Sequence, residues 1–524
     1  MDVRIGKTVI ETLTEGMYED SKFIYREYIQ NAADQIDKAI ELGILKERKE
    51  GKVHINIDIG KEQIVIEDNA TGIESEKVFK TLGNIALSEK DRTKNKGFRG
   101  IGRLGGLGYC DELVYETSYP GENTKTIMKW DAKKLRCLLH DKAITKDAGN
   151  VVKSVIDIET CPEDTEKHYL KVILNNVKNK TLLEINEIKE YLSMVAPIPY
   201  RSHFVFCTKI YDYARENDFR IDEYYIYLNN DQLYKPYKTF LYEKSDGNER
   251  KKYDEITDVS FFDIKNKDKI LAWGWYGISR FEKQIPRISN YYRGIRLRKG
   301  NIQIGNEQVF IDHKISKDER DNAYFIGEIF CIHNDLIPNS RRDYFNENEI
   351  LESFERALKT IYSEKLHNIY YKASAYKNAI KKINKVSEYQ DEFEEKERTG
   401  FIGDEKETLT EKIESARRDA ADSEKKIEKI KKEVDKSNIE NNDTLKKVIT
   451  LIEKEYKKEN ITPDTFDKID VNAISKKQPR FVDQFSGLNK RERKLIDKIL
   501  SIIKNTLPPS ISEELIEKIK EEFK

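Results

Sequence analysis

The sequence predicts an α+β protein with a two-layer N-terminal domain, a second α/β domain and a helical C-terminal region. Three observations predict this order. Helical spacing alternates with strictly alternating apolar segments over roughly the first 200 residues, as in helices beside an antiparallel sheet. The mixture continues to residue 349, after which long, highly charged helical patterns replace it. We therefore expect domains at 1–204, 205–349, 350–440 and 441–524.

Each element follows from its own local pattern. Segments 53–60 and 63–69 alternate apolar and polar residues, which predicts a hairpin that turns at Gly60 and Lys61. Pro197 and Pro199 should end the helix that precedes them. The remaining expected elements of the first 349 residues are strands at 112–118, 170–177, 224–230 and 270–278 and a helix at 182–200.

The C-terminal region should contain two long helices. The first runs from Leu351 to about Arg398 and breaks at Gly400 and Gly403, which allow turn conformations. The simplest geometry is an antiparallel hairpin, and pairing with a second chain is the alternative. A heptad-like coiled-coil seam in the second helix comprises Leu409, Ile413, Ala416, Ala420, Ser423, Ile427, Ile430 and Val434.

Charge and cysteine usage exclude several classes of protein. The 94 basic and 95 acidic residues nearly balance, which argues against a protein built mainly to bind polyanions. The five cysteines are odd in number and widely spaced, which favours a reducing cytoplasm over a disulfide framework or a zinc site. The N-terminus lacks the apolar core of a signal peptide, and no run of about 18 apolar residues could span a membrane.

Three segments carry the candidate chemistry. In "YREYIQNAADQIDKA", residues 25–39, Glu27, Asn31 and Asp34 share one face of a helix that is otherwise largely apolar. Asp68 then ends a strand and leads into a loop with Gly72. "KGFRGIGRLGGLG", residues 96–108, has six glycines, whose backbone amides can cradle phosphate oxygens. Each segment alone is more typical of ion pairing or a tight turn, but their order favours a nucleotide pocket.

These segments resemble the GHKL ATPases, which include ninety-kilodalton heat-shock chaperones, bacterial HtpG, MutL, MORC proteins, type II topoisomerases and histidine kinases. "REYIQNAADQIDK" resembles their Glu-x-x-x-Asn-x-x-Asp helix, and "EDNATGI" resembles their Asp-x-Gly-x-Gly loop. "LGNIALS" is similar to a chaperone lid segment, and "IGRLGGLG" to the glycine segment that closes the site. "HNDLIPNSRRDYF" resembles a middle-domain loop that delivers an arginine to the γ-phosphate. The resemblance implies a GHKL (Bergerat) two-layer α/β sandwich.

The resemblance also implies roles for individual residues, with ATP and Mg²⁺ as cofactors. Glu27 would be the general base, and Asn31 would hold Mg²⁺. Asp68 would accept the adenine amino group. Arg342, or its neighbour Arg341, would act as an arginine finger. The other nucleotide-binding residues would be Asp34 and Gly72, the lid residues Leu82 and Gly83, and Gly100, Ile101, Gly102, Arg103, Leu104 and Gly105 around the triphosphate.

The expected function is a homodimeric, slowly hydrolysing ATPase clamp of heat-shock-chaperone type, with a lid at about 74–99. It would act with an unidentified protein partner, and its layout resembles components of bacterial multi-gene systems, including anti-phage defence. The alternative is a DNA-acting clamp of MutL or MORC type. Its candidate basic patches, 489–494 and "RLRK" at 296–299, are more typical of solvated surface. A histidine kinase is disfavoured because no histidine lies in a dimerisation helix before the ATPase segment.

Overall fold

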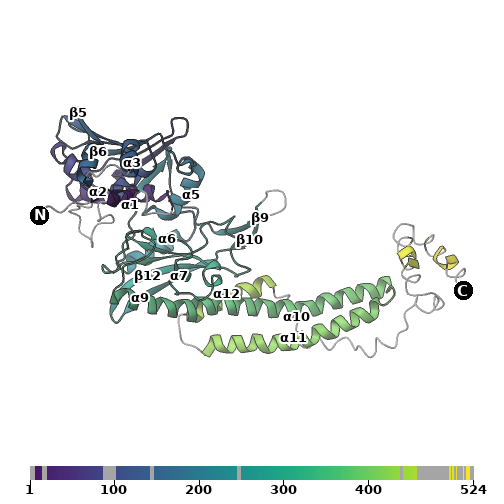
Figure 1. Ribbon diagram of the computed structural model, residues 1–524. Helices are drawn as coiled ribbons and strands as arrows, with labels where there is room; N and C mark the ends of the chain where they lie inside the picture. Colours follow the sequence, from purple (N-terminus) through teal and green to yellow (C-terminus); the bar gives the residue numbers. More distant parts are fainter. Residues whose placement is uncertain are drawn as a thin grey trace. The chain divides into compact units, whose positions relative to one another are not determined.

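The computed structural model describes residues 6–14, 20–85, 102–141, 147–244, 250–436 and 441–456, together with scattered positions between 495 and 519. The chain divides into two compact units, Met1–His367 and Asn368–Lys524. Unit 1 contains both large sheets, and unit 2 contains long helices (Figure 1). The α+β fold class predicted from the sequence is thereby confirmed, while the finer domain boundaries at 204, 349 and 440 stay predictions.

The first sheet of unit 1 has eight strands in the order β5-β4-β3-β6-β2-β1-β7-β8. Neighbouring strands are antiparallel except for β1 and β7, which run parallel. The strands are β1 (Lys52–Asp58), β2 (Gln63–Asp68), β3 (Glu112–Ser118), β4 (Thr124–Asp131), β5 (Ile156–Pro162), β6 (Tyr169–Asn175), β7 (Tyr225–Leu228) and β8 (Asp231–Gln232).

The hairpin of β1 and β2 confirms the prediction made from alternation. Val53 pairs with Asp68 and Ile57 with Ile64, so the turn falls at residues 59–62. Alternate residues of both strands are buried, which is the pattern of a sheet covered on one face. The strands predicted at 112–118 and 170–177 and the helix ended by prolines are also present, within a few residues of their expected ends.

Helices cover the buried face of this sheet and complete one apolar core. The largest contribution comes from α2 (Phe23–Glu41), whose buried residues recur every three or four positions. The other helices around this sheet are α1 (Thr8–Thr14), α3 (Ala132–His140), α4 (Ala148–Lys153), α5 (Ile185–Val195) and the short helical turns η1 (Arg48–Glu50), η2 (Ser75–Lys77), η3 (Phe79–Gly83), η4 (Gly102–Gly108) and η5 (Lys180–Leu183).

The second sheet of unit 1 has five strands in the order β11-β12-β15-β13-β14, with β13 and β15 parallel. Its central strands are buried along nearly their whole length, because side chains cover both faces. The strands are β11 (Asp258–Asn266), β12 (Lys269–Ile278), β13 (Gly294–Lys299), β14 (Ile302–Ile304) and β15 (Ile326–Cys331), and a separate ribbon pairs β9 (Phe240–Lys244) with β10 (Arg250–Glu255).

Helices of the second half of unit 1 accompany this sheet. They are α6 (Cys207–Glu216), α7 (Val309–Asp312), α8 (Arg320–Ala323), α9 (Glu349–Thr360) and the π-helical turn η6 (Ile361–Leu366). Asn348 begins α9 by accepting a hydrogen bond from the Leu351 amide at 2.8 Å. The loop 333–345 lies between β15 and α9, so both ends of the predicted arginine loop are anchored.

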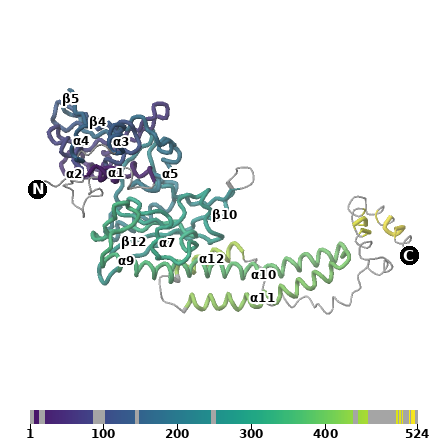
Figure 2. The backbone as a smooth tube through the Cα atoms, in the orientation of Figure 1, coloured from purple at the N-terminus to yellow at the C-terminus, as the bar shows by residue number. Residues whose placement is uncertain are grey.

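Unit 2 is a helical hairpin with a third helix against it (Figure 2). Helices α10 (His367–Thr399) and α11 (Glu405–Lys436) are joined by a turn in which Gly400 and Gly403 have positive φ. Seam residues of α11 pack on α10, as Ala416 and Ala420 do on Val386. Helix α12 (Asn441–Tyr456) joins through the Tyr376 hydroxyl, which donates to Glu453 at 2.5 Å. The seam packs within this chain, whereas coiled-coil pairing between chains stays a prediction.

Two features are absent from the part of the chain that the structure describes. No helix there is long and apolar enough to cross a membrane. No group of three or more histidine, cysteine, aspartate or glutamate residues in those same ranges is arranged to hold a metal ion.

Candidate functional site

The polar face of α2 is the floor of the candidate site. Glu27 has only 12% of its side chain exposed, Asn31 is half-buried one turn later, and Asp34 is buried one turn beyond that. The apolar face of the same helix places Tyr25, Ile29 and their neighbours in the apolar core. A 3.6-residue period therefore separates the polar set from the structural set along one helix.

The glycine segment lies directly on this polar face. A Cβ atom added to Gly102 would lie 2.0 Å from the Glu27 carboxylate oxygen Oε2, and one added to Gly105 would lie 2.8 Å from the Phe23 ring. Only the absence of a side chain lets the backbone of η4 approach α2 so closely. Leu104, between these glycines, is fully buried in the core. Gly100 and Ile101 lie outside the described residues.

Two buried tyrosines donate hydrogen bonds to the backbone of the glycine segment. The Tyr28 and Tyr115 hydroxyls both donate to the carbonyl oxygen of Arg103, at 2.9 and 2.5 Å. Burial raises the pKa of both phenols, so they remain protonated donors at neutral pH. Sequence reasoning missed both tyrosines, because an aromatic residue at a helical or strand spacing reads as ordinary core.

The Asp68 loop is tied to the same helix. Asp68 is buried at the end of β2, and its carboxylate accepts a hydrogen bond from the Ala70 amide at 3.1 Å. The Thr71 hydroxyl donates to Gln35 of α2 at 2.8 Å. Gly72 has a φ of +63°, and a Cβ there would lie 1.8 Å from the Ser118 carbonyl oxygen. The predicted requirement for glycine at this position therefore has a steric cause.

Two further predicted residues lie beside the first sheet, in η3. Leu82 is buried, and Gly83 approaches Met128 of β4 so closely that a Cβ would lie 3.2 Å from the methionine methyl group. The Arg103 side chain donates to the carbonyl oxygen of Asn84, just after η3. This bond joins the glycine segment to residue 84 within the predicted lid. Residues 86–101, which include most of that lid, lie outside the described residues.

The arginine loop brings one of its two arginines to α2. Arg342 has a φ of +56° and is buried, and its Nε lies 3.9 Å from the Glu27 oxygen Oε1. Arg341 is exposed, and its backbone carbonyl accepts a hydrogen bond from Arg26 of α2 at 2.9 Å. A non-glycine residue with positive φ is uncommon, and at this one the side chain is buried. Of the two candidates, Arg342 is therefore the one placed beside Glu27.

These groups fit a nucleoside triphosphate with its magnesium ion. The site combines a carboxylate, an amide oxygen and a guanidinium beside a glycine-rich stretch of backbone. At Gly102 the backbone approaches the Glu27 carboxylate so closely that no Cβ fits, and backbone free of side chains is what phosphate-binding segments use. Asp68, at the end of β2, adds a buried acceptor that the Thr71–Gln35 bond keeps next to α2.

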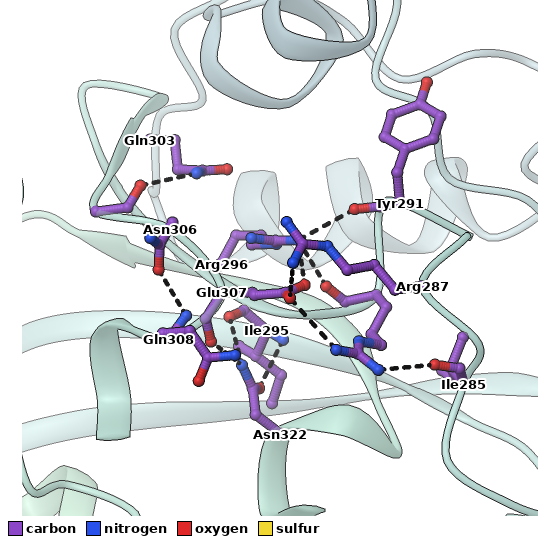
Figure 3. A network of polar contacts seen from close by, with 12 residues as sticks. Ile285, Arg287, Tyr291, Ile295, Arg296, Gln303, Asn306, Glu307, Gln308 and Asn322 are labelled. Atoms are coloured by element: carbon purple, nitrogen blue, oxygen red, sulfur yellow. Dashed lines mark hydrogen bonds and ion pairs between the residues drawn. The ribbon is translucent and has the colours of Figure 1, made fainter. Parts of the chain in front are cut away.

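The "RLRK" segment is not a solvated surface patch, and that interpretation was wrong. Arg296 and Arg298 are both buried, because the segment forms β13 in the interior of the second sheet. Figure 3 shows Arg296 and Arg287 directed at Glu307, with Nη–Oε distances of 3.4 and 3.3 Å. The second basic segment, 489–494, lies outside the described residues.

Comparison with known proteins agrees with this arrangement. Residues 20–147 match the model of the family described as histidine kinase-, DNA gyrase B-, and HSP90-like ATPase. The chaperone protein HtpG of Wigglesworthia glossinidia brevipalpis is 27% identical over 201 residues, which are 35% of this chain and 30% of that protein. HtpG of Rickettsia typhi is 26% identical over 148 residues, or 25% of this chain and 23% of that protein.

A shorter match has a higher identity. HtpG of Orientia tsutsugamushi is 32% identical over 92 residues, which are 17% of this chain and 14% of that protein. The matches thus span less than a third of the length of these relatives. Residues 20–147 are therefore similar to the histidine kinase-, DNA gyrase B-, and HSP90-like ATPases, and part of this chain is similar to HtpG.

Proposed function

We propose that this protein is a Mg²⁺-dependent ATPase whose slow turnover drives a conformational clamp. The observation that supports it most is the convergence of Glu27, the Gly102 backbone and Arg342 from three separate elements. A base, an anion cradle and a cation are the groups that phosphoryl transfer to water needs. A structural ion pair alone would not require glycine at position 102.

In the proposed reaction, a water oxygen attacks the γ-phosphorus and the bond from that phosphorus to the β,γ-bridging oxygen breaks. The Glu27 carboxylate orients the water and accepts its proton, and ADP departs with the bridging oxygen. Arg342 supplies positive charge to the oxygens that become more negative during transfer. A Mg²⁺ ion bound with the nucleotide would supply further positive charge at the phosphates, and Asn31 is the side chain that would hold it.

Adenine recognition is assigned to Asp68. A carboxylate only accepts hydrogen bonds, so it matches the amino group of adenine and not the carbonyl oxygen that guanine has at the same edge. Asp68 is buried, and the Ala70 amide already donates to its carboxylate, so an adenine amino group would be a second donor to the same side chain. Gly72 would let the base lie against the backbone, and Asp34, Leu82 and Gly83 would line the pocket.

The clamp is proposed to work as a homodimer in the cytoplasm. ATP would order the lid at about 74–99, two protomers would close, and hydrolysis would reopen them. Helices α10 and α11 are each about 50 Å long at 1.5 Å per residue, and they offer a surface for a protein partner. A place for this clamp in a bacterial anti-phage system stays a prediction from its layout.

Steady-state hydrolysis with and without Mg²⁺ tests this proposal. We expect wild-type protein to release phosphate from ATP slowly, chelation of Mg²⁺ to stop it, and Glu27→Ala to bind ATP without hydrolysis. Light scattering should then show Glu27→Ala with ATP as a dimer. A wild-type protein that neither binds nor hydrolyses ATP would contradict the proposal.

The DNA-clamp alternative has lost one of its two candidate surfaces, since Arg296 and Arg298 are buried. A DNA clamp should bind duplex DNA with an affinity that falls steeply with salt, because neutralised phosphates release counterions. We expect no such salt-dependent binding at concentrations near physiological. Tight binding with a steep slope would restore the alternative.

A further inference from the structure

Strand β13 directs two buried arginines into the second sheet of unit 1. Arg296 and Arg298 are two residues apart, so they share one face of the strand. Each pairs with a different buried carboxylate, Arg296 with Glu307 and Arg298 with Glu328. Unpaired buried charges are strongly destabilising. These ion pairs therefore restrict the positions of the segments that contain Glu307 and Glu328.

The pair around Arg298 contains a third charge. The Lys235 Nζ lies 2.7 Å from the Glu328 oxygen Oε2, and Arg298 donates to the other oxygen of the same carboxylate. The three side chains of this cluster, which we call the buried charge cluster, are fully buried. One carboxylate thus serves two cations. Burial, and then the neighbouring Arg298, lowers the pKa of Lys235 to about 7.

The buried charge cluster joins the second sheet to the segments that leave the first sheet. Arg298 donates to the carbonyl oxygen of Met194, in the last turn of α5, at 2.8 Å. The Lys235 backbone amide donates to the Pro199 carbonyl at 2.9 Å, and the Tyr200 hydroxyl donates to Glu328. Glu328 itself lies in β15, the strand that leads into the arginine loop.

A second route runs from the cluster to α2. Lys235 also donates to the Asn301 side-chain oxygen at 2.8 Å, and the Asn301 amide donates to the Asp222 carbonyl at 2.6 Å. The Asp222 carboxylate lies 3.1 Å from Arg48, which in turn lies 2.8 Å from Asp37 of α2. The helix that carries Glu27 is therefore connected to the cluster by contiguous polar contacts.

The other arginine of β13 holds the opposite end of the β13–β14 hairpin. Arg296 pairs with Glu307, three residues beyond β14, and donates to the Arg293 carbonyl at 2.7 Å (Figure 3). Between β14 and Glu307, the Gly305 amide donates to the Arg342 carbonyl at 2.9 Å. A Cβ at Gly305 would lie 2.7 Å from the Asp343 carbonyl, so the loop rests directly on this hairpin.

We propose that Lys235, Arg298 and Glu328, with Arg296 and Glu307, are positioning residues that hold the Arg342 loop opposite Glu27. In this proposal they act through Arg342 and not on the substrate. The inference rests on the proposed ATPase function. Misplacement of a catalytic group by about 1 Å can cost about a hundredfold in rate, which gives such residues a measurable effect.

Two substitutions test the positioning role against a purely structural one. Lys235→Met removes the surplus cation and leaves the Arg298–Glu328 pair, and Arg296→Met leaves Glu307 paired with Arg287 and Arg293. Both variants should therefore fold. We expect each to lower kcat by about tenfold or more while the Kd for ATP changes by less than about twofold. Arg287→Met is the matched control, because Arg287 contacts the same Glu307 from an exposed position, and it should keep wild-type kcat.

The same substitutions in an Arg342→Ala background separate the outcomes. If the residues act through Arg342, they should lower kcat no further there, because coupled residues are not additive. An equal fall of kcat in the wild-type and the Arg342→Ala backgrounds, an unchanged kcat when the substitutions are made in wild-type protein, or a loss confined to ATP affinity would overturn the inference. Absence of ATP hydrolysis by wild-type protein would instead contradict the proposed function itself. If Lys235→Met does not fold, Arg48→Gln breaks the half-buried link to Asp37 and carries the same expectations.

Discussion

Two charged segments of unit 1 are residues 25–39 and 294–299. They differ in how well the sequence pattern predicts where their charged side chains lie. In α2, Glu27, Asn31 and Asp34 follow a helical period and lie on the face turned toward the glycine segment. In β13, arginines alternate with apolar residues, which is the pattern of a strand with one solvated face. Yet Arg296 and Arg298 are both buried.

The difference follows from what covers each element. A helix at the edge of a core has one buried stripe, so its polar residues lie where a ligand can reach them. A central strand covered on both faces has no solvated side, and any charge on it needs a partner inside. Polar periodicity in α2 therefore indicates a site, whereas the same kind of periodicity in β13 indicates internal ion pairing.

The largest effect is expected from Glu27, which belongs to the helical segment of this comparison. Glu27→Ala should reduce kcat for ATP hydrolysis by about 10²- to 10⁴-fold, because it removes the general base, while ATP still binds. Phosphate release and equilibrium binding measure the two quantities separately. Glu11→Ala, at another helical glutamate, serves as control and should retain wild-type turnover. Undiminished hydrolysis by Glu27→Ala would remove Glu27 from the reaction.

The next effect distinguishes the two arginines of the loop. Arg342→Ala should lower kcat by about a hundredfold, as expected when one preorganised donor to a developing charge is removed. Arg341→Ala should stay within about twofold of wild type, because the Arg341 side chain is exposed and the hydrogen bond to Arg26 of α2 uses the backbone carbonyl, which alanine keeps. The reverse order of effects would show that the loop turns on nucleotide binding and exchanges the two side chains.

The smallest effect is a pH dependence of stability that arises from Lys235, in the buried charge cluster beside β13. Lys235 faces Glu328, Arg298, Glu223, Asn301 and Tyr200, and its pKa falls from 10.5 to about 7 on folding. Between these values the unfolded chain binds more protons at Lys235 than the native one, so the contribution of Lys235 to stability rises as pH rises from about 7. The slope for one proton is at most about 1.4 kcal/mol per pH unit.

Denaturant unfolding checks this sign. All three tryptophans, Trp130, Trp273 and Trp275, lie in unit 1, so their fluorescence reports that unit alone. The free energy of unfolding of wild type, relative to that of Lys235→Met, should increase between pH 7 and pH 9. A difference that is constant over this range, or that decreases, would show that Lys235 keeps an ordinary pKa.

Much of the first half of the fold could be predicted from the sequence. Alternation located the β1–β2 hairpin, and prolines located the end of α5, because these signals depend on local geometry alone. The sequence could not show that β7 and β8, beyond residue 204, extend the first sheet, because strand partners are chosen by tertiary packing. The burial of both faces of β13 could not be predicted from the sequence for the same reason.

The candidate site divides in a similar way. Glu27, Asp68 and the glycines were predicted because residue type, spacing and order together carry the signal. The choice of Arg342 over Arg341 needed the positive φ of Arg342, which no residue pattern around it predicts. The tyrosines under Arg103 and the links through Asp222 were missed, because each is a contact between segments far apart in the chain.

Calorimetric titration of ATP with Mg²⁺ into wild type and Asp68→Asn tests the central claim most directly. The account predicts saturable, one-site binding by wild type, weaker GTP binding, and a loss of about 1.5–3 kcal/mol in ATP binding free energy for Asp68→Asn, the typical worth of a hydrogen bond to a charged group. Thr126→Val, at a buried position on β4, should bind as wild type does. Equal ATP affinity of wild type and Asp68→Asn, or no binding by wild type, would contradict the account.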